Sequence, residues 1–202
     1  MKKILLIRHG KTQGNLERRY IGRTDEPLCE AGRAALEGHS YPPCDILLSS
    51  PMVRCLETGE ILYPGKQPEI VPDLRECDFG RFEGKTYAEL CTDPDYQRFL
   101  DSNGTGEIPQ GESAAQFRER SLRGFRQVLE ILDKAQWQTA ALICHGGTIM
   151  SVLDAYDPEH LGFYQYQVEN GGVYLGYYEE ENHRFSPREI SFPMRQMGWG
   201  IQ

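Results

Sequence analysis

The sequence predicts an α/β fold built as one domain. Three short apolar runs, at 3–7, 45–48 and 139–143, have the length and composition of buried strands. Each run ends in polar residues followed by Gly or Pro, and a segment with helical spacing comes after it. At 202 residues the chain is long enough to bury a sizeable core without disulfides or a metal.

The ends of these strands are the first candidates for a functional site, because ligands of open α/β sheets bind outside the carboxyl ends of the strands. The first run is followed by Arg8-His9-Gly10, and the third by His145-Gly146. A polar segment at 11–15 could present backbone N–H groups and an amide to an anion. The loop at 18–25 is rich in hydrogen-bond donors.

The second strand leads into a helix that is predicted to run to about Leu62. Ser50 is the expected N-cap, and Pro51 the first helical residue. Arg54 then lies in the first turn, so that two strand ends each deliver an arginine to the same edge of the sheet. The residues of this helix expected to face the core are Val53, Leu56, Ile61 and Leu62.

The remaining elements follow in order along the chain. A short helix is expected at about 31–38, and a brief third strand at 69–71. The loop at 73–84 gathers charges, aromatic residues and glycines, a composition typical of functional loops. Two short helices are expected at 87–91 and 95–100.

The C-terminal half contains the longest predicted helix, between Glu112 and Ala135, where apolar residues recur at helical spacing. Another helix is expected at 148–156. Aromatic and polar residues alternate over 173–178, and the chain returns over 184–192. This pattern predicts a C-terminal antiparallel hairpin on one edge of the sheet.

The charge distribution favours a small anionic ligand. The formal net charge is −8, which argues against nucleic acid as the main partner. Residues 1–23 nevertheless hold seven Lys or Arg residues and one Glu. A locally basic N-terminus on an acidic body suits a small anion better than a polyanion.

Composition also bounds the compartment and the role of the cysteines. No apolar run approaches the ~18 residues of a membrane-spanning helix, and the first run is too short for a signal-peptide core. We therefore expect a cytoplasmic protein without a membrane partner. The cysteines, which lack C-x-x-C spacing and are expected to be small core residues, are Cys29, Cys44, Cys55, Cys77, Cys91 and Cys144.

The candidate residues together suit the chemistry of a phosphoryl group. The strand ends supply Arg8, His9, Arg54 and His145, and the loop at 73–84 supplies Glu76 or Glu83. A guanidinium matches phosphate oxygens bidentately. An imidazole nitrogen can attack phosphorus and hold the group covalently, and a carboxylic acid can protonate the departing oxygen.

Five motifs, in order along about 3–155, resemble those of the histidine phosphatases, the phosphoglycerate mutase-like superfamily. They are LIRHGKTQGN at 6–15, SSPMVRCLET at 49–58, LRECDFGRFEG at 74–84, GES at 111–113 and HG at 145–146. Each motif alone is weak, whereas the five together are highly specific. Two positions depart from the pattern: Cys29 stands where members often have a helix-capping Thr, and Gln110 where a second Gly is common.

The resemblance implies a role for each candidate. His9 would be the phosphorylated nucleophile and Glu76 the proton donor, with Glu83 a structural partner. No metal and no cofactor are implied. The residues that would hold the phosphoryl oxygens are Arg8, Asn15, Arg54, His145 and Gly146.

The resemblance also implies the architecture in more detail. It predicts a three-layer α/β/α fold with a mostly parallel central sheet, within a single domain over 1–202. A small helical cap insert is expected at about 84–111. Residues 19–25 look most like the α-ribazole phosphatase branch, which predicts substrate contacts at Arg19, Tyr20, Gly22 and Arg23.

Three functions remain as hypotheses. The leading one is a metal-independent phosphomonoesterase that acts on a small phosphorylated metabolite, α-ribazole 5'-phosphate being one candidate. The second is a cofactor-dependent phosphoglycerate mutase; such mutases resemble one another in a longer insert, whereas only 68 residues separate Glu76 from His145 here. The third is a non-catalytic phospholigand-binding sensor, which the full set of catalytic residues disfavours. The sequence leaves open the natural substrate and whether the chain forms a homodimer.

Overall fold

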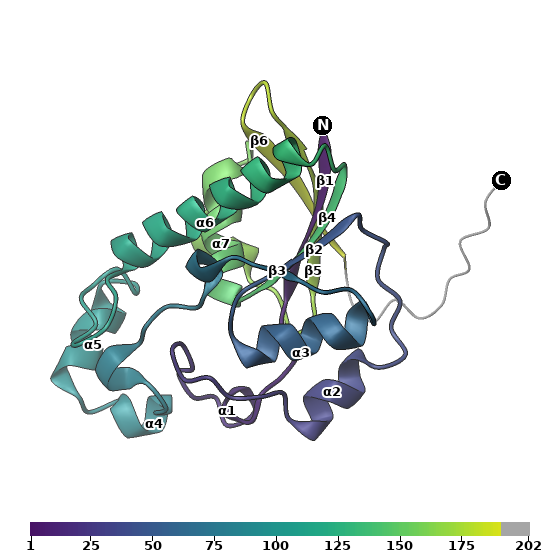
Figure 1. Cartoon of the computed structure of the whole chain (residues 1–202). Helices are drawn as coiled ribbons and strands as arrows, with labels where there is room; N and C mark the ends of the chain where they lie inside the picture. Colours follow the sequence, from purple (N-terminus) through teal and green to yellow (C-terminus); the bar gives the residue numbers. More distant parts are fainter. Residues whose placement is uncertain (191–202) are drawn as a thin grey trace.

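Strands from both halves of the chain join in one sheet in the computed structural model, which describes residues 1–190 (Figure 1). The parallel part has the order β3-β2-β4-β1. β5 and β6 form an antiparallel hairpin beside β1, so the predicted hairpin on one edge is confirmed. The end predicted for its second strand, 191–192, lies outside the described residues. The strands are β1 (Lys2–Arg8), β2 (Ile46–Ser49), β3 (Glu69–Ile70), β4 (Thr139–Cys144), β5 (Val173–Glu179) and β6 (Arg184–Ile190).

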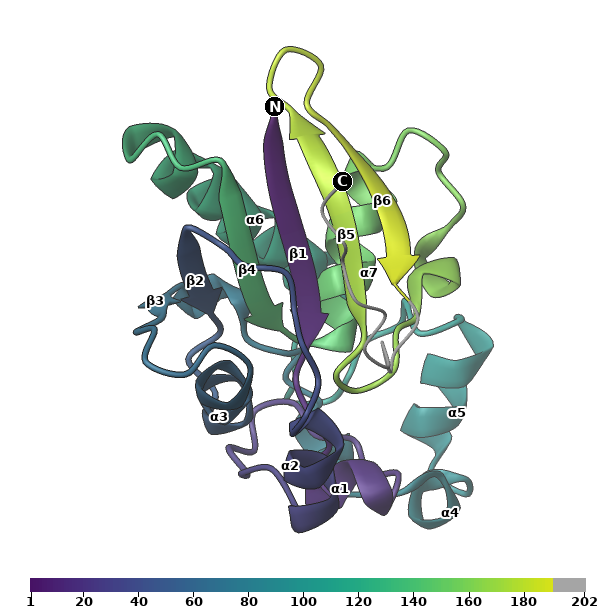
Figure 2. The ribbon, with the colours of Figure 1, turned by 90° about the vertical axis from the view of Figure 1, so that its right-hand side faces the viewer.

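Helices cover both faces of this sheet, as a three-layer α/β/α fold requires (Figure 2). Side chains of a strand alternate between its two faces. In β1, Ile4 and Leu6 therefore pack in the cluster that includes residues of α6 and α7, whereas Leu5 and Ile7 pack with α2 and α3. These four side chains are fully buried. The helices are α2 (Glu30–Leu36), α3 (Val53–Leu62), α6 (Ala114–Lys134) and α7 (Gly146–Tyr156).

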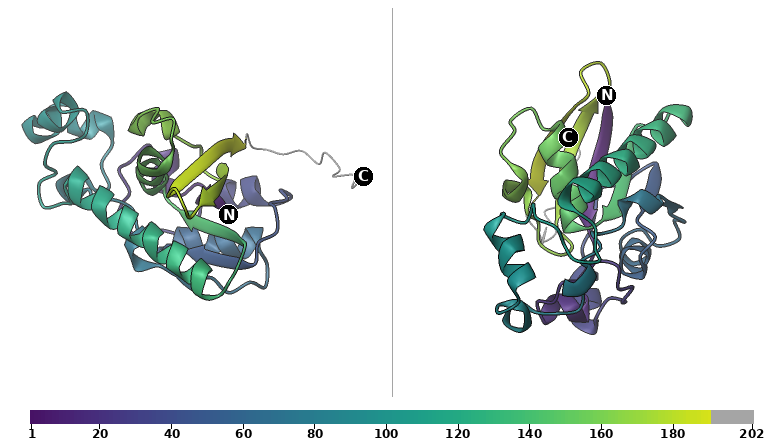
Figure 3. Two further views of the ribbon diagram at one scale, coloured as in Figure 1. Left: turned by 90° about the horizontal axis from the view of Figure 1, so that it is seen from above. Right: turned by 90° about the vertical axis from the view of Figure 1, so that its left-hand side faces the viewer.

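Two further helices, α4 (Tyr87–Leu90) and α5 (Pro94–Asp101), lie away from the sheet, near the start of α6 (Figure 1, Figure 3). Both were expected from the sequence. Asp93 caps α5 by accepting hydrogen bonds from the backbone of its first turn, and Pro94 is the first helical residue. This region has an apolar cluster of its own, which consists of Cys77, Phe82, Leu90, Tyr96, Ile108 and Phe117.

Several short elements were not expected from the sequence. They are α1 (Gln13–Leu16) and the 3₁₀ helices Pro72–Leu74, Gly80–Phe82 and Phe163–Tyr166. A capping box between Thr12 and Asn15 starts α1. At the next helix, α2, the Cys29 sulfur accepts from the Gly32 N–H, so the cysteine acts as the cap there. Within residues 1–190, no helix has the length and apolar character to cross a bilayer.

The predicted start of α3 is wrong. The helix begins at Val53, and Met52 makes no side-chain cap bond. The Val53 N–H instead donates to Asp25 Oδ1 at 2.7 Å, so a carboxylate from a distant loop caps the helix. The Ser50 hydroxyl instead forms a hydrogen bond, 2.8 Å long, with Nε2 of His145, which follows β4.

The buried face of α3 also differs from the prediction. Val53, Leu56 and Ile61 are only half-buried, and Leu62 is buried. Two polar side chains of the helix, Arg54 and Thr58, are fully buried. The complete buried set of α3 is Arg54, Cys55, Thr58, Gly59 and Leu62. The helix therefore turns its arginine inward, which apolar periodicity alone does not indicate.

The Asp25 cap can be tested by stability. Asp25→Ala should lower the free energy of unfolding by about 1 kcal/mol, because the Val53 N–H loses its acceptor. Urea denaturation measures the change. Glu60→Ala, at an exposed position of the same helix, is the control and should change stability by less than about 0.5 kcal/mol. Equal stability of Asp25→Ala and the wild type would show that the cap does not stabilise α3.

Candidate active site

The two histidines meet at the carboxyl ends of neighbouring parallel strands. In the register of β1 and β4, Arg8 pairs with Cys144, so His9 and His145 follow at the same level. Their ring centroids lie 5.2 Å apart in an edge-on arrangement. Both side chains are buried. The strand ends predicted to converge therefore do so.

The His9 ring is arranged to act as a nucleophile. Its Nδ1 lies 2.7 Å from the Gly10 carbonyl oxygen, which can only accept, so Nδ1 carries the proton and Nε2 keeps its lone pair. Burial lowers the pKa of His9 well below its usual value, and the charges of Arg54 and Arg8 add to this. The Gly10 N–H donates to Thr58 Oγ1 at 3.0 Å, which fixes the backbone beside the ring.

The two arginines are held by backbone carbonyls. Arg54 is fully buried, and its Nη1 and Nη2 donate to the carbonyls of Thr24 and Gly22 at 2.8 and 2.9 Å. Arg8 Nη1 donates to the Val168 carbonyl at 2.6 Å. These bonds fix both guanidinium groups, and neither forms a salt bridge with a carboxylate of residues 1–190, so their positive charge is available to an anion.

Three buried nitrogen atoms have no hydrogen-bond partner within the described part of the chain: Arg8 Nε, Arg54 Nε and His145 Nδ1. Leaving a buried polar group unpaired costs about 1–3 kcal/mol, and more when it is charged. All three belong to residues predicted to hold phosphoryl oxygens. Their presence at one strand edge therefore fits an anion with several oxygen atoms.

The second imidazole of the pair is positioned by a hydroxyl and a thiol. His145 Nε2 lies 2.8 Å from Ser50 Oγ and 3.6 Å from Cys55 Sγ. Burial and the nearby Arg54 charge lower the pKa of His145 well below its usual value. Burial raises the pKa of Cys55 to about 12, so this thiol stays neutral beside the ring.

Glu76 lies at the N-terminus of α7. Its Oε1 accepts from the Cys77 N–H at 2.9 Å and its Oε2 from the Gly147 N–H at 3.3 Å. A Cβ at position 147 would lie only 2.6 Å from Oε1, so this approach requires glycine. Burial raises the pKa of Glu76 despite these N–H groups and the charges of Arg54 and Arg8. The carboxyl thus keeps its proton to a higher pH than an ordinary Glu.

Asn15 is linked to the His9 backbone through Asn170, and Gly146 begins the helix that follows His145. Asn15 Oδ1 accepts from Thr12 N at 3.2 Å and from Asn170 Nδ2 at 3.1 Å, so the donor that Asn15 could offer to a phosphoryl oxygen is its own Nδ2. Gly146 is the first residue of α7, and a Cβ there would lie 3.4 Å from Arg8 Nε. Sequence reasoning did not identify Asn170, which also donates to the His9 carbonyl at 3.1 Å.

The residues predicted to contact substrate at 19–23 are placed differently from one another. Two cavities are lined by Glu76, and Tyr20 lines the larger of them, with its hydroxyl 2.8 Å from that of Tyr96. Arg19 forms ion pairs with Glu17 and Glu89. Gly22 and Arg23 instead line the smaller cavity.

Glu83 fixes this loop through the backbone. Its Oε1 accepts from the N–H groups of Gly22 and Thr24 at 2.8 and 2.9 Å, and its Oε2 accepts from Phe79 N at 3.3 Å. Gly22 and Thr24 also supply the carbonyls that Arg54 binds. Glu83 thus holds the loop in the conformation that positions the arginine.

The larger cavity has a volume of about 1160 Å³ and opens beside the candidate residues. Arg8, Glu76, Gly146 and Gly147 line it. Most of its other walls are apolar, and the aromatic side chains among them are Tyr20, Phe79, Phe99, Phe117, Phe163 and Tyr164. Of these rings, sequence reasoning identified Tyr20 as a substrate contact and missed the other five, because they come from separate segments of the chain. Over residues 1–190, no three His, Cys, Asp or Glu side chains are grouped so that they could bind a metal ion.

Comparisons with known proteins identify related chains. A family model described as the histidine phosphatase superfamily (branch 1) matches residues 4–188. The chain is 35% identical over 159 residues to the "Probable phosphoglycerate mutase GpmB" of Cronobacter sakazakii, an alignment that covers 72% of this chain and 70% of that protein.

Solved structures share the fold. The phosphoglycerate mutase of Thermus thermophilus has a TM-score of 0.70 at 30% identity, over 95% of this chain and 99% of that one. The α-ribazole phosphatase of Shigella flexneri has a TM-score of 0.78 at 20% identity, over 93% of this chain and 95% of that one. The second likeness, at this identity, shows the fold alone.

The geometry predicts where an anion binds. In a crystal soaked with inorganic phosphate, oxygens should lie about 3 Å from Arg8 Nε, Arg54 Nε and His145 Nδ1. His145→Ala should weaken phosphate binding roughly tenfold, measured by calorimetry, because one buried hydrogen bond to a charged ligand is lost. Phosphate bound instead in the smaller cavity, beside Arg75 and Arg123, would contradict this placement.

Proposed function

The chain belongs to the histidine phosphatase superfamily, branch 1, and we propose that it hydrolyses phosphate monoesters through a phosphohistidine at His9. The observation that carries this proposal is the neutral His9 ring beside three buried nitrogens that have no hydrogen-bond partner among residues 1–190. A carboxyl with a raised pKa, Glu76, lies in the same site. Nucleophile, anion-binding groups and acid are thus present together.

In the first step, His9 Nε2 attacks phosphorus, and the bond between phosphorus and the alcohol oxygen breaks. The proton of the Glu76 carboxyl passes to the departing oxygen, so an alcohol leaves. Arg8 and Arg54 meet the charge on the phosphoryl oxygens with fixed N–H groups, which need no rearrangement as the charge develops.

In the second step, water attacks the phosphorus of the phosphohistidine. The Glu76 carboxylate accepts a proton from the water, and the N–P bond breaks to regenerate the neutral His9 ring. Inorganic phosphate leaves, and Glu76 is again protonated. The two steps sum to hydrolysis of one monoester without a further reactant.

The cavity supports an alcohol that carries an aromatic ring. A volume of about 1160 Å³ far exceeds the needs of a three-carbon acid, and aromatic rings line much of it. α-Ribazole 5'-phosphate, with its aromatic base, is a substrate of this kind.

A phosphoglycerate mutase is the second candidate, because the Cronobacter and Thermus relatives carry that name. Transfer back to phosphoglycerate calls for a cationic group that binds its carboxylate. Within the described residues, the Arg and Lys side chains that line the larger cavity are Arg8 and Arg118. Arg8 faces the phosphoryl site, and Arg118 already forms an ion pair with Asp154. This arrangement favours hydrolysis.

The covalent step gives the first test of the proposal. His9→Ala should lower turnover by roughly 10³-fold or more, because no neighbouring group replaces the nucleophile. Rapid quenching with a ³²P-labelled substrate should trap acid-labile, base-stable label on His9 in the wild type and none in His9→Ala. Activity should survive excess EDTA and be inhibited by vanadate.

The control for this experiment is His160→Ala, an exposed histidine that should retain both label and turnover. Label on Ser50 or on a cysteine would contradict the phosphohistidine mechanism. Activity that EDTA removes and magnesium or zinc restores would contradict it as well.

The cavity gives the second test. Phe99→Ala should lower kcat/KM for 4-nitrobenzyl phosphate roughly tenfold, because a ring contact in the cavity is lost, and should leave glycerol 3-phosphate unaffected. Tyr177→Ala, a partly exposed aromatic residue on β5, is the control. If 3-phosphoglycerate isomerises faster than phosphate is released from any monoester, the mutase function holds instead.

A further inference from the structure

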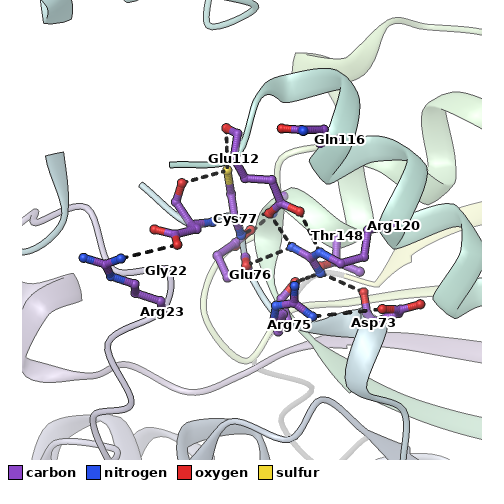
Figure 4. Close-up of polar contacts among 12 residues, drawn as sticks. Gly22, Arg23, Asp73, Arg75, Glu76, Cys77, Glu112, Gln116, Arg120 and Thr148 are labelled. Carbon is purple, nitrogen blue, oxygen red and sulfur yellow. Dashed lines mark hydrogen bonds and ion pairs between the residues drawn. The ribbon is translucent and has the colours of Figure 1, made fainter. Parts of the chain in front are cut away.

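One buried ion pair outside the site described above lies directly behind Glu76 (Figure 4). Arg120, on α6, is 4% exposed. Its Nε and Nη2 donate to Glu112 Oε1 and Oε2 at 2.8 and 2.6 Å, a bidentate contact. Glu112 belongs to the Gly-Glu-Ser motif that precedes α6. The ion pair therefore joins a residue of that motif to an arginine of the helix.

The rest of the guanidinium binds the backbone that leads to Glu76. Arg120 Nη1 donates to the carbonyls of Asp73 and Arg75 at 2.8 and 2.9 Å, and Nη2 donates to the Glu76 carbonyl at 3.2 Å. Figure 4 shows these bonds fanning out from one side chain. All five N–H groups of Arg120 are therefore used, and three of them reach main-chain atoms of 73–76.

The ion pair also contacts the chain on the other side of Glu76, through Glu112. The Glu112 N–H donates to the Asp78 carbonyl at 2.9 Å, and Glu112 Oε2 lies 3.4 Å from the Asp78 N–H. The Arg120 guanidinium also stacks over the Phe117 ring, at 5.3 Å from its centroid, and Phe117 lines the larger cavity. The backbone on both sides of Glu76 is thus fixed to the start of α6.

We propose that Arg120, anchored by Glu112, is a positioning residue for the Glu76 carboxyl. The guanidinium fixes the main chain of Glu76 from behind, while the N–H groups of Cys77 and Gly147 hold its carboxyl in front. The inference rests on the proposed function, in which Glu76 protonates the leaving alcohol. The inference adds that the position of the Glu76 carboxyl depends on the Arg120–Glu112 ion pair as well as on the N–H groups that bind the carboxyl directly.

Arg123 provides a matched comparison on the same helix. Its Nε forms an ion pair with the Asp73 carboxylate at 2.6 Å, and the side chain is 55% exposed. It therefore also joins α6 to the segment before Glu76, but through a surface side chain and not through the main chain of Glu76. A general effect of loosening α6 should appear in both arginine variants, and a positioning effect in Arg120 variants alone.

The test compares two substrates that differ in how much the leaving group needs a proton. 4-Nitrophenolate departs readily without one, whereas the alkoxide of 4-nitrobenzyl alcohol does not. The quantity measured is the single-turnover rate of phosphohistidine formation from each phosphate, expressed as the benzyl-to-phenyl ratio. This ratio is independent of the fraction of enzyme that is folded, so a partly unfolded variant still gives an answer.

Glu76→Gln should lower the ratio by roughly 10²-fold or more, because the acid is absent. Arg120→Lys keeps the charge but loses the planar fork, and Glu112→Gln keeps the shape but loses the charge. Each should lower the ratio about tenfold or more, in the direction of Glu76→Gln. Arg123→Lys should leave the ratio unchanged. Arg120→Lys in the Glu76→Gln background should not lower it further, because the two changes remove one function.

The pH profile gives a second readout. Burial keeps the pKa of Glu76 raised in the wild type, so phosphohistidine formation from the benzyl ester falls only as the pH rises through that raised value. If Arg120→Lys lets the carboxyl reach solvent, its pKa drops and the fall occurs at lower pH. Arg8, Arg54 and the N–H groups of Cys77 and Gly147, which favour the carboxylate, are the same in both proteins.

Equal losses on both substrates in Arg120→Lys and Glu112→Gln, with an unmoved pH profile, would overturn the positioning role and leave a structural one. A further, multiplicative loss in the Glu76→Gln background would overturn it too. If His9 is labelled but Glu76→Gln leaves the ratio unchanged, this inference falls while phosphohistidine hydrolysis stands. Absence of label on His9 would overturn the proposed function itself.

Discussion

The structure depends on holding one buried arginine, one half-buried arginine and two buried imidazoles together at the ends of adjacent strands. Charged groups taken out of water are costly unless they are paired or hydrogen-bonded. Here backbone carbonyls supply the acceptors: Gly22 and Thr24 for Arg54, and Val168 for Arg8. The loops that carry these carbonyls come from opposite halves of the chain. Their conformation is therefore set by the need to satisfy the arginines, and they in turn shape the cavity.

The part of the site that the sequence predicts well is the part that parallel strands impose. A His-Gly pair after two apolar runs leads to His9 and His145 side by side, because carboxyl ends of parallel strands share one edge. The order of the elements follows for the same reason. The cap of α3 could not be predicted from neighbouring residues. The Ser50 hydroxyl bonds to His145, and Asp25, from a distant loop, caps the helix. A capping partner remote in sequence leaves no pattern beside the helix.

The remaining features were out of reach for a similar reason. Arg120 has the sequence context of a solvated helix arginine, and only the folded chain shows it buried against the carbonyls of 73–76. Apart from Tyr20, the aromatic lining is spread over segments that share no periodicity, from Phe79 to Tyr164. Arg54 falls between these cases: the motif indicates its role, whereas the apolar spacing of α3 suggests a different buried face.

The cavity and the anion-binding groups are built from different parts of the chain, which bears on how such a protein diverges. The groups that would hold phosphate come from strand ends and helix starts, where a substitution disturbs the buried register. Many of the rings that would meet the alcohol lie on α5, the start of α6 and the 3₁₀ helix Phe163–Tyr166. Mutation can thus replace rings such as Phe99 one at a time while the reaction centre is inherited intact. Selection for a new metabolite would then act on these rings, and paralogues could share one chemistry while they differ in the alcohol released.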